Sequence, residues 1–571
     1  MVDKETSEKR PSFWRRHRWL TGFGGCLLAA LVIAAVLADI ALHRVEPFLR
    51  ARIVEALRDR FHARVELDSF HVSLVKGLTA EGKGLRIWPP AQVEGVTVPG
   101  SEPPAVTGPN DPLIQLEEFK FHAPLHYQLG KPFHISMVEL KGLDVHLPPH
   151  SHFTHAASGD GSQNKANSSL VSFGVDSIVC NAAHLVLETS KPGKLPLDFA
   201  IAHFTLKDVS AGGSMAFEAD LTNPKPVGTI HTTGSFGPWL SGDPGESPIA
   251  GDYSFNHADL SSFKGIAGIL SSTGRYQGTL RDIVTDGTTD TPDFRLSQFN
   301  KAMPLHTRFH AKVDGTNGDT WLQPVDATLG HSHFTAQGQI VRVMVTGPDG
   351  KPESGGHDIS LKVNVDGGHI EDFLRLASHS DTPLLTGAAT VKANLHIPPG
   401  PQPVHKRMEL DGVFTLDQVR FSSPKIQSRI EELSMRGLGR PKDAKKPGNA
   451  DVVSTMQGNF KMANGAVGLP SLVYTVPGAQ INLTGTYSVE SGALAFTGTA
   501  KLQATVSEMV GGWKGLLLKP VDRYFKRDGA GTEVPIHIDG TRDDPKFGID
   551  LDRMKDTSPQ RPSDQPASQP Q

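Results

Sequence analysis

The sequence predicts a mainly β protein in which one N-terminal transmembrane helix precedes a large antiparallel β region with a few short helices. Two observations lead to this prediction. The segment Leu20–Ala38 is apolar and carries no charge. The chain after it alternates apolar and polar residues in short runs, separated by turns that use many of its 58 Gly and 42 Pro. Alternation with a period of two is the pattern of strands that bury one face, and frequent Gly and Pro disfavour long helices.

The charge and cysteine content exclude some classes of protein. A formal net charge of -4 over 571 residues, with dispersed basic residues, leaves no nucleic-acid-binding surface. The two cysteines, Cys26 and Cys180, form no disulfide framework, because Cys26 lies inside the apolar segment. One pair of cysteines also cannot build a Cys-based metal site.

The apolar segment predicts an uncleaved membrane anchor. At about 1.5 Å per residue, Leu20–Ala38 spans roughly 28 Å, close to the hydrocarbon thickness of a bilayer. The positive-inside rule places the preceding residues in the cytoplasm and exports everything after Asp39. The alternative is a signal peptide cleaved after Val36–Ala38. We favour the anchor because the apolar run is long and amphipathic sequence follows at once. The flanking basic and aromatic residues are Lys9, Arg10, Arg15, Arg16, Arg18, Trp14 and Trp19.

The pattern after the anchor predicts the following organisation. Apolar residues at helical spacing in Pro47–Phe61 indicate a short amphipathic helix, lying on the membrane or, as we favour, packed on its own domain. The tail is too polar to build a core. The predicted regions are a basic cytoplasmic N-terminus (1–19), a transmembrane anchor (20–42), a helix-plus-strand region (43–150), a linker (151–169), a β-rich region (170–555) and a disordered tail (556–571).

Several individual elements can also be predicted. A change of phase within Arg64–Leu74 indicates two strand segments separated by a bulge. The clearest hairpin joins Ile481–Val489 to Ala493–Leu502 through a Glu-Ser-Gly turn. Further strands are predicted at Leu113–Phe121, at Phe133–Leu147 and in the alternating run Leu195, Leu197, Phe199 and Ile201, and short helices at Ile370–Ala377 and Met509–Phe525.

The search for catalytic motifs is negative, since no HExxH, GxSxG, Walker A or dinucleotide fingerprint stands at a credible strand–helix junction. The carboxylates of the segment Asp314–Asp319 have the oxygen chemistry of a Ca²⁺ loop, but the EF-hand spacing is missing and a hairpin turn explains them better. We therefore expect no enzymatic activity, no catalytic residues, no cofactor and no metal ion.

Two other groups of residues have more than one interpretation. The 25 histidines include two sets that suggest a weak metal site, although a functional site needs three or four converging ligands. The segment Met509–Phe525 either contacts lipid through its apolar and basic residues or packs as a plug on the end of the sheet. The histidine sets are His150, His152 and His155 in one loop and His331 and His333, expected on one face of a strand.

The exported sequence resembles the AsmA family of bacterial inner-membrane-anchored periplasmic proteins. The resemblance implies an elongated, curled β-groove with an apolar interior, a role in outer-membrane homeostasis and phospholipid transport between membranes, and no catalytic residues. The segments that carry it, besides the anchor and helix, are RVELDSFHVSLVKGLTAEGKGLRI (Arg64–Ile87), FHISMVELKGLDVHLPP (Phe133–Pro149), PLDF (Pro196–Phe199), LKDV (Leu206–Val209), ADLSSFKGIAGILSSTGRYQGTL (Ala258–Leu280), LLTGAATVKANLHIPPG (Leu384–Gly400) and VPIHIDGTRDDPKFGIDL (Val534–Leu551).

These observations lead to one main hypothesis and two alternatives. The main hypothesis is a groove that binds or conducts phospholipids, anchored in the bacterial inner membrane by a single span, with the N-terminus cytoplasmic and the bulk periplasmic. The first alternative is a non-enzymatic assembly factor or scaffold for outer-membrane proteins that acts through strand-edge contacts. An exported hydrolase is disfavoured by the absence of motifs. The expected partners are the inner membrane, phospholipids and outer-membrane or periplasmic proteins, and not nucleic acid.

Overall fold

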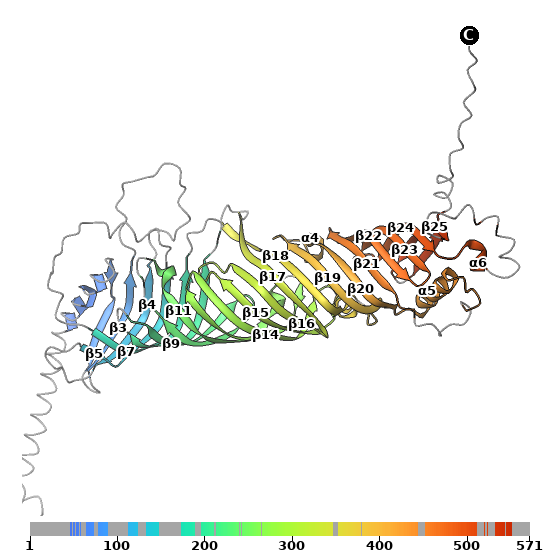
Figure 1. The fold of residues 1–571 in the computed structure, drawn as a ribbon. Helices are drawn as coiled ribbons and strands as arrows, with labels where there is room; N and C mark the ends of the chain where they lie inside the picture. The colour runs from blue at the N-terminus through green and yellow to red at the C-terminus, as the bar shows by residue number, and fades with distance from the viewer. Residues whose placement is uncertain are drawn as a thin grey trace, which may run out of the picture. The chain divides into compact units, whose positions relative to one another are not determined.

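The structure is a computed structural model, and it confirms a mainly β chain with a few short helices (Figure 1). Among the described residues, no helix is both long and apolar enough to cross a membrane. The predicted anchor, the linker and the tail lie outside these residues and stay predictions. The described residues are 46–47, 50–51, 53–55, 57–58, 64–73, 78–88, 112–123, 133–147, 173–188, 194, 196–209, 213–238, 240, 243–263, 265–346, 352–378, 380–443, 452–510, 519, 522, 531–542 and 544–550.

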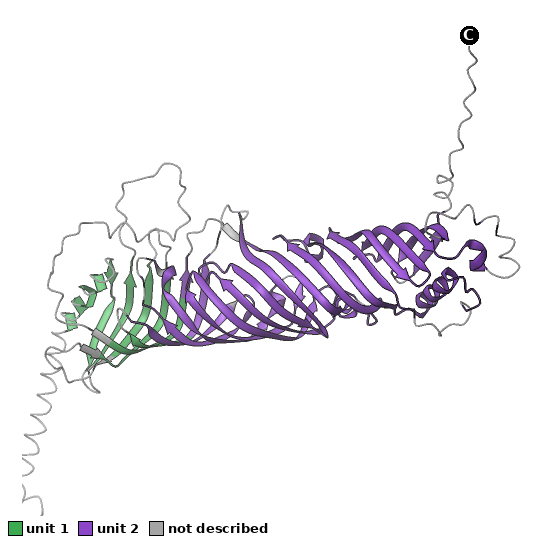
Figure 2. Ribbon diagram, in the orientation of Figure 1, with its two compact units in different colours: residues 1–146, 160–184, 203–210 green, residues 147–159, 185–202, 211–571 purple. Residues whose placement is uncertain are grey.

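The chain divides into two compact units (Figure 2). Unit 1 comprises residues 1–146, 160–184 and 203–210, and unit 2 comprises residues 147–159, 185–202 and 211–571. The first strands are β1 (Val65–Glu66), β2 (Ser69–Ser73), β3 (Leu78–Ile87), β4 (Ile114–Ala123), β5 (Phe133–Ile135) and β6 (Met137–Leu147). The strands β7 (Phe173–Leu187) and β8 (Leu197–Val209) each contribute residues to both units.

Unit 1 contains a small sheet covered by the N-terminal helix. The segments β1 and β2 both pair antiparallel with β3, which pairs with β4, and β4 pairs with β6. The predicted change of phase is confirmed, because Val65 and Leu67 are buried and the next buried residue is Phe70. The described residues between positions 46 and 58 are helical, and Ile53 and Val54 pack against the core of this unit. The interpretation of this helix as packed on its own domain is therefore confirmed.

Unit 2 is built on one long antiparallel meander that forms a curled sheet (Figure 1). Each strand from β9 to β26 pairs with the next, except that β11 pairs directly with β13 and the short β12 pairs with β14. The strands are β9 (Met215–Pro224), β10 (Val227–Phe236), β11 (Pro248–Asp259), β12 (Ile266–Ala267), β13 (Ile269–Thr279), β14 (Asp282–Leu296), β15 (Met303–Val313), β16 (Thr320–Leu329), β17 (Ser332–Thr346), β18 (Pro352–His369), β19 (Leu385–Ile397), β20 (Glu409–Phe421), β21 (Thr455–Ala463), β22 (Ala466–Val476), β23 (Ala479–Ser488), β24 (Ala493–Leu502), β25 (Thr532–Thr541) and β26 (Pro545–Ile549).

Among the described residues, short α-helices interrupt this meander, including α3 (Ile370–Leu376), α4 (Val404–Arg407), α5 (Pro424–Gly437) and α6 (Val506–Val510). Helix α3 confirms the predicted helix at Ile370–Ala377. Helix α5 was not predicted, although Pro424 at its first turn and apolar residues at Ile426, Ile430 and Leu433 are a helical signal.

The predicted strands agree closely with the observed ones. Strand β4 (Ile114–Ala123) begins one residue after the start of the predicted strand Leu113–Phe121, and the predicted strand Phe133–Leu147 is divided into β5 and β6. The predicted hairpin is present as β23 and β24, with Tyr487 opposite Leu494 and Gly492 at a left-handed φ of 70° in the turn. Of the segment Met509–Phe525, the described residues are Met509 and Val510, which end the short α6, and the helical residues Lys519 and Asp522. The lipid and plug interpretations of that segment therefore both remain open.

Candidate functional site

One face of the unit 2 sheet is largely apolar along its whole length. In an antiparallel sheet, directly opposed residues point to the same side, so the pairing register traces a face across successive strands. We call the side that carries Val365 and Phe414 the sheltered face. The row of opposed residues through it, from β9 to β26, is Leu221, Ile230, Phe255, Ser272, Thr289, Thr307, Ala327, Phe334, Val365, Val391, Phe414, Gly458, Leu472, Leu483, Gly498, Ile536 and Ile549.

The opposite side, here the exposed face, is mostly polar. The row next to Val365 and Phe414 on this face is Asn364, Lys392 and Val413. Residue exposure follows the same alternation, since Val365 is 2% exposed whereas Val413 is 49% exposed. Along β20 and β21 the sheltered positions are buried or half-buried, and most positions between them are exposed. The sequence alternation is therefore the alternation of these two faces.

The curl of the sheet provides most of the shelter for the apolar face. Among the described elements, α3 packs on β19 and α5 packs on β20 and β23, and the other extensive contacts of the long strands are with their neighbours in the sheet. Because no second sheet covers the face in the part of the chain that the structure describes, many of its apolar side chains remain half-buried rather than fully buried. Such a face keeps accessible apolar surface that a ligand can remove from water.

Glycines let aromatic rings lie flat along the sheltered face. A Cβ at Gly412 would lie 2.7 Å from the ring of Phe460, and a Cβ at Gly458 would lie 3.2 Å from the ring of Phe414. The centroids of the Phe414 and Phe460 rings are 6.2 Å apart. Each ring thus occupies the space that a side chain on the neighbouring strand would fill. The result is a surface of aliphatic and aromatic carbon.

One end of the sheltered face is closed by a packed core. Its buried residues come from β19, β20, β22, β23 and β24 and include Val452 before β21, and Ile430 and Leu433 of α5 pack against them. Ser434 of α5 donates a hydrogen bond to the carbonyl of Pro477 at 2.7 Å, which attaches the helix to the end of β22. The buried core residues are Leu385, Ala389, Leu416, Val419, Val452, Tyr474, Val476, Ala479, Ala500 and Leu502.

The strand ends on opposite sides of the sheet approach each other at one place in unit 2. In a meander, successive connections alternate between the two ends, so the β11–β13 connection and the β17–β18 and β19–β20 connections lie at opposite ends. Nevertheless, the ring of Phe263 in the first connection lies 6.0 Å from the ring of His357 on β18. A Cβ at Gly265 would lie 2.8 Å from Val404 of α4. The sheet is therefore curled strongly enough to bring its two rims into contact here.

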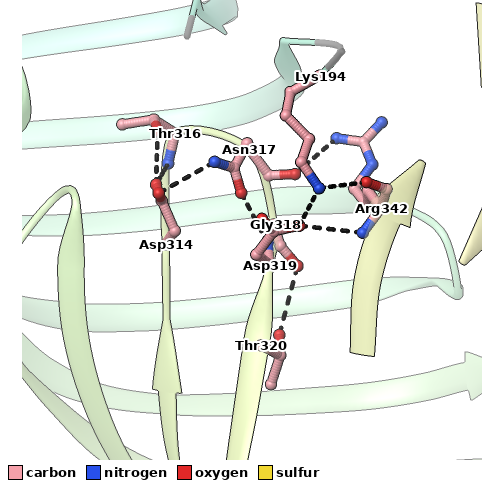
Figure 3. A network of polar contacts seen from close by, with 8 residues as sticks. All are labelled: Lys194, Asp314, Thr316, Asn317, Gly318, Asp319, Thr320 and Arg342. Atoms are coloured by element: carbon pink, nitrogen blue, oxygen red, sulfur yellow. Dashed lines mark hydrogen bonds and ion pairs between the residues drawn. The ribbon is translucent and has the colours of Figure 1, made fainter. Parts of the chain in front are cut away.

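The Asp314–Asp319 hairpin lies beside this contact, and its carboxylates serve the turn (Figure 3). The Asp314 carboxylate accepts hydrogen bonds from the backbone and hydroxyl of Thr316 and, at 3.0 Å, from Asn317 Nδ2. Asp319 Oδ1 accepts from Lys194 Nζ at 3.0 Å and from the backbone N of Arg342 at 3.0 Å. These contacts confirm the interpretation of the segment as a hairpin turn, with its acidic groups used inside the protein.

Basic side chains collect around the same hairpin. Arg342 and His357 are opposed on β17 and β18, two residues beyond the opposed pair Ile340 and Ile359 of the sheltered face. Lys194, from the segment before β8, reaches Asp319 and the carbonyl of Arg342 (Figure 3). Lys225 in the β9–β10 turn lies over the Phe263 ring at 5.7 Å. We call Lys194, Lys225 and Arg342 the basic cluster.

The electrostatics of the cluster are unbalanced towards positive charge. Burial lowers the pKa of Arg342, and the Coulomb attraction of Asp319 opposes that effect. Burial also lowers the pKa of His357, and the charges of Lys225 and Arg342 lower it further. His357 is thus held in its neutral form among cations, while the carboxylate of Asp319 acts in the opposite direction and raises its pKa.

The two predicted histidine sets do not form a site among the described residues. His150, His152 and His155 lie outside them. The expectation that His331 and His333 share a strand face was wrong, because His331 lies in the β16–β17 turn and faces Asp372 at 3.9 Å. In the part of the chain that the structure describes, no group of three His, Cys, Asp or Glu side chains has the geometry to hold a metal.

The exposed face instead pairs histidines with carboxylates across strands. His306 Nδ1 lies 2.7 Å from Asp290, and His310 Nδ1 lies 2.6 Å from Asp286. Close to the first pair, His333 helps to line an open depression of about 510 Å³, whose other lining residues are Ser, Thr, Asp, His and Arg of strands β13 to β16. These cross-strand pairs account for several histidines as partners within the sheet.

Cys180 is a buried thiol on β7 without a disulfide. Burial raises its pKa to about 11, which keeps it protonated and unreactive at neutral pH. The other cysteine, Cys26, lies outside the described residues.

Sequence reasoning did not identify the basic cluster. Its members are more than 100 residues apart at the extremes, and only the curl of the sheet brings Lys194 to Arg342. One signal was available, because Arg342 interrupts an otherwise apolar phase that runs from Phe334 through Ile340 along β17. A charge in the apolar phase of a strand suggests either a rim position or a binding function.

Comparison with known proteins does not assign this chain to a family. The chain matches no protein-family model, and neither the curated proteins nor the solved structures contain a significant match. The curled, mainly β sheet agrees with the architecture that the AsmA resemblance implies. Membership of that family stays a prediction.

Proposed function

We propose that the protein is an AsmA-like, membrane-anchored periplasmic protein whose curled sheet forms a groove that binds or conducts phospholipids between the inner and outer membranes, and so supports outer-membrane biogenesis. The observation that carries the proposal is the sheltered face, with its continuous row of apolar residues from Phe334 to Leu483. The predicted anchor Leu20–Ala38 supplies the attachment to the inner membrane. The proposal includes no catalytic step.

The physical basis of the proposal is the affinity of acyl chains for apolar surface. Burial of each methylene group is worth about 0.8 kcal/mol, so a chain that lies along several strands gains a favourable free energy without any specific hydrogen bond. The half-buried side chains of the sheltered face offer that surface, and the flat rings over Gly412 and Gly458 leave no polar obstruction. A row that crosses many strands also lets a chain move between equivalent positions.

The proposal is tested by lipid analysis of the full-length protein purified in detergent. We expect phospholipid to co-purify and Leu395→Asp to reduce the bound amount severalfold, because a carboxylate on the sheltered face opposes acyl-chain contact. The matched control is Asn394→Asp, the adjacent residue on the exposed face of β19, which should leave the bound lipid unchanged. Native mass spectrometry counts the phospholipid molecules bound to each protein chain. A folded protein without lipid, or equal losses in the two variants, would refute the groove.

The assembly-factor alternative rests on the last described strand. Within the described residues, β26 pairs with β25 alone, and its side chains Phe547 and Ile549 are 50% and 56% exposed. A strand edge with exposed apolar residues can accept another strand. If lipid is absent and Phe547→Lys abolishes cross-linking to an outer-membrane protein, this second function replaces the first.

A further inference from the structure

The basic cluster lies at the end of the sheltered face, where an amphiphile would place its polar group. Arg342 follows Ile340 on the same side of β17, and His357 precedes Ile359 on the same side of β18. The apolar row continues from the opposed pair Ile340 and Ile359 to Ile397 on β19. Positive charge and apolar surface are therefore adjacent on one continuous face.

The hydrogen-bonding capacity of the cluster exceeds the acceptors that the described residues supply. The guanidinium of Arg342 donates one hydrogen bond there, from Nη1 to the carbonyl of Asn317 at 3.1 Å, although a guanidinium has five donors. The Lys194 ammonium binds Asp319 and the carbonyl of Arg342. The contact of the Lys225 ammonium is with the ring of Phe263. Among these contacts, only the Lys194 ammonium binds a carboxylate, that of Asp319.

Partial burial makes this arrangement unfavourable without a further anion. Arg342 is half-buried, and the removal of water from a guanidinium is costly unless an anion compensates it. The planar fork of Arg binds phosphate oxygens in a bidentate manner, and Lys binds them as a point charge. The two residue types together are typical of a phosphate site at the boundary between polar and apolar surroundings.

We propose that Lys194, Lys225 and Arg342 bind the phosphate group of an anionic phospholipid whose acyl chains lie on the sheltered face. This inference rests on the proposed function and extends it, because it names the headgroup chemistry and the place where the headgroup sits. Lys194 and Arg342 are positioned by the Asp314–Asp319 hairpin, and Lys225 and His357 both contact the ring of Phe263. The contact between the two rims therefore completes the site.

The test compares two lipids that differ only in the headgroup. The full-length protein in an uncharged detergent is titrated with dioleoyl phosphatidylglycerol and with dioleoylglycerol, and native mass spectrometry measures each bound fraction. We expect a preference for the phospholipid of about tenfold, the effect of one or two charge-assisted hydrogen bonds. The double variant Lys225→Gln/Arg342→Gln should lose this preference and bind dioleoylglycerol as before.

Two controls separate the site from general electrostatics and from misfolding. Arg275→Gln and Lys312→Gln remove exposed charges from the other face of the sheet and should keep the preference. The single variant Lys225→Gln should also lower the preference for the phospholipid. Because Lys225 is an exposed turn residue, this loss cannot come from unfolding.

The outcomes distinguish the two proposals. Binding of both lipids without a preference, or a preference that survives the double variant, overturns the phosphate site and leaves the groove intact. Failure to bind either lipid overturns the proposed function itself. Displacement of dioleoyl phosphatidylglycerol by inorganic phosphate at comparable concentration would show a site for free phosphate and would overturn the lipid assignment.

Discussion

The two halves of the sheltered face differ in chemistry although they belong to one continuous sheet. In β9 to β16 the face includes Ser272, Thr289 and Thr307, together with two tyrosines. In β17 to β24 the same row contains only aliphatic, aromatic and glycine residues, such as Val391 and Leu472. A single architecture thus presents a hydroxyl-bearing region followed by a hydrocarbon region.

The hydroxyl groups of the first half are paired within the sheet. Thr232 donates to the carbonyl of Asp252 at 2.9 Å, so Tyr276 is the donor in the 2.6 Å contact between their hydroxyls. Ser272 likewise donates to the carbonyl of Thr288, so Tyr253 donates to Ser272 at 3.0 Å. Burial raises the pKa of both tyrosines, which keeps these donors protonated. The comparison shows that polarity on a sheltered face can be neutralised locally, without a ligand.

The largest effect is expected from the core of the second half. Leu416→Ala should lower the free energy of unfolding by about 2–5 kcal/mol, because Leu416 is 3% exposed and its removal leaves a cavity. Val413 on the same strand is 49% exposed on the other face, so Val413→Ala should change stability by less than about 0.5 kcal/mol. Urea unfolding of the two full-length variants measures the difference. Similar losses would mean that the two faces are not distinguished as described.

A smaller effect should separate the tyrosines of the two halves. Tyr276→Phe removes a donated hydrogen bond and should cost about 1 kcal/mol. The hydroxyl of Tyr474 is buried without a hydrogen bond of normal geometry, and the hydroxyl of Ser454 beside it donates to the carbonyl of Val419. Tyr474→Phe should therefore be neutral or stabilising. Thermal unfolding of the pair tests this, and the reverse order would contradict the hydrogen-bond assignment.

The smallest effect concerns the exposed face and its pH dependence. Hydrogen bonds to Glu409 and then to Asp358 raise the pKa of His396 above its ordinary value. The stabilisation is therefore fully present below the unfolded pKa of about 6.5 and is lost as the pH rises through the higher folded pKa. Because the side chain is exposed, the contribution should stay below about 1 kcal/mol. NMR titration gives the pKa, and His396→Gln should remove the corresponding slope in stability. A pKa at or below 6.5 would disprove the pairing.

Local patterns were sufficient to predict much of the fold. Alternation in Ile481–Val489 and a Glu-Ser-Gly turn predict the hairpin that β23 and β24 form. The helix α3 is recognised from its apolar spacing. Helix α5 was not predicted, although Pro424 in its first turn and the spacing of its apolar residues are a helical signal. The pairing of strands required the structure, because many alternating runs of similar composition are interchangeable in a sequence.

The candidate site, too, could be predicted from the sequence only in part. The sequence by itself determined that each strand has an apolar side and a polar side, because side chains alternate along any extended chain. The alternation did not determine that the sheet curls around its apolar side, which only the resemblance to the AsmA family implied, or that Phe263 meets His357 across the rims. Those features depend on the twist and bulges accumulated over many strands. They also bring Lys194, Lys225 and Arg342 near His357. No local sequence pattern specifies this proximity, because it depends on the curl of the sheet.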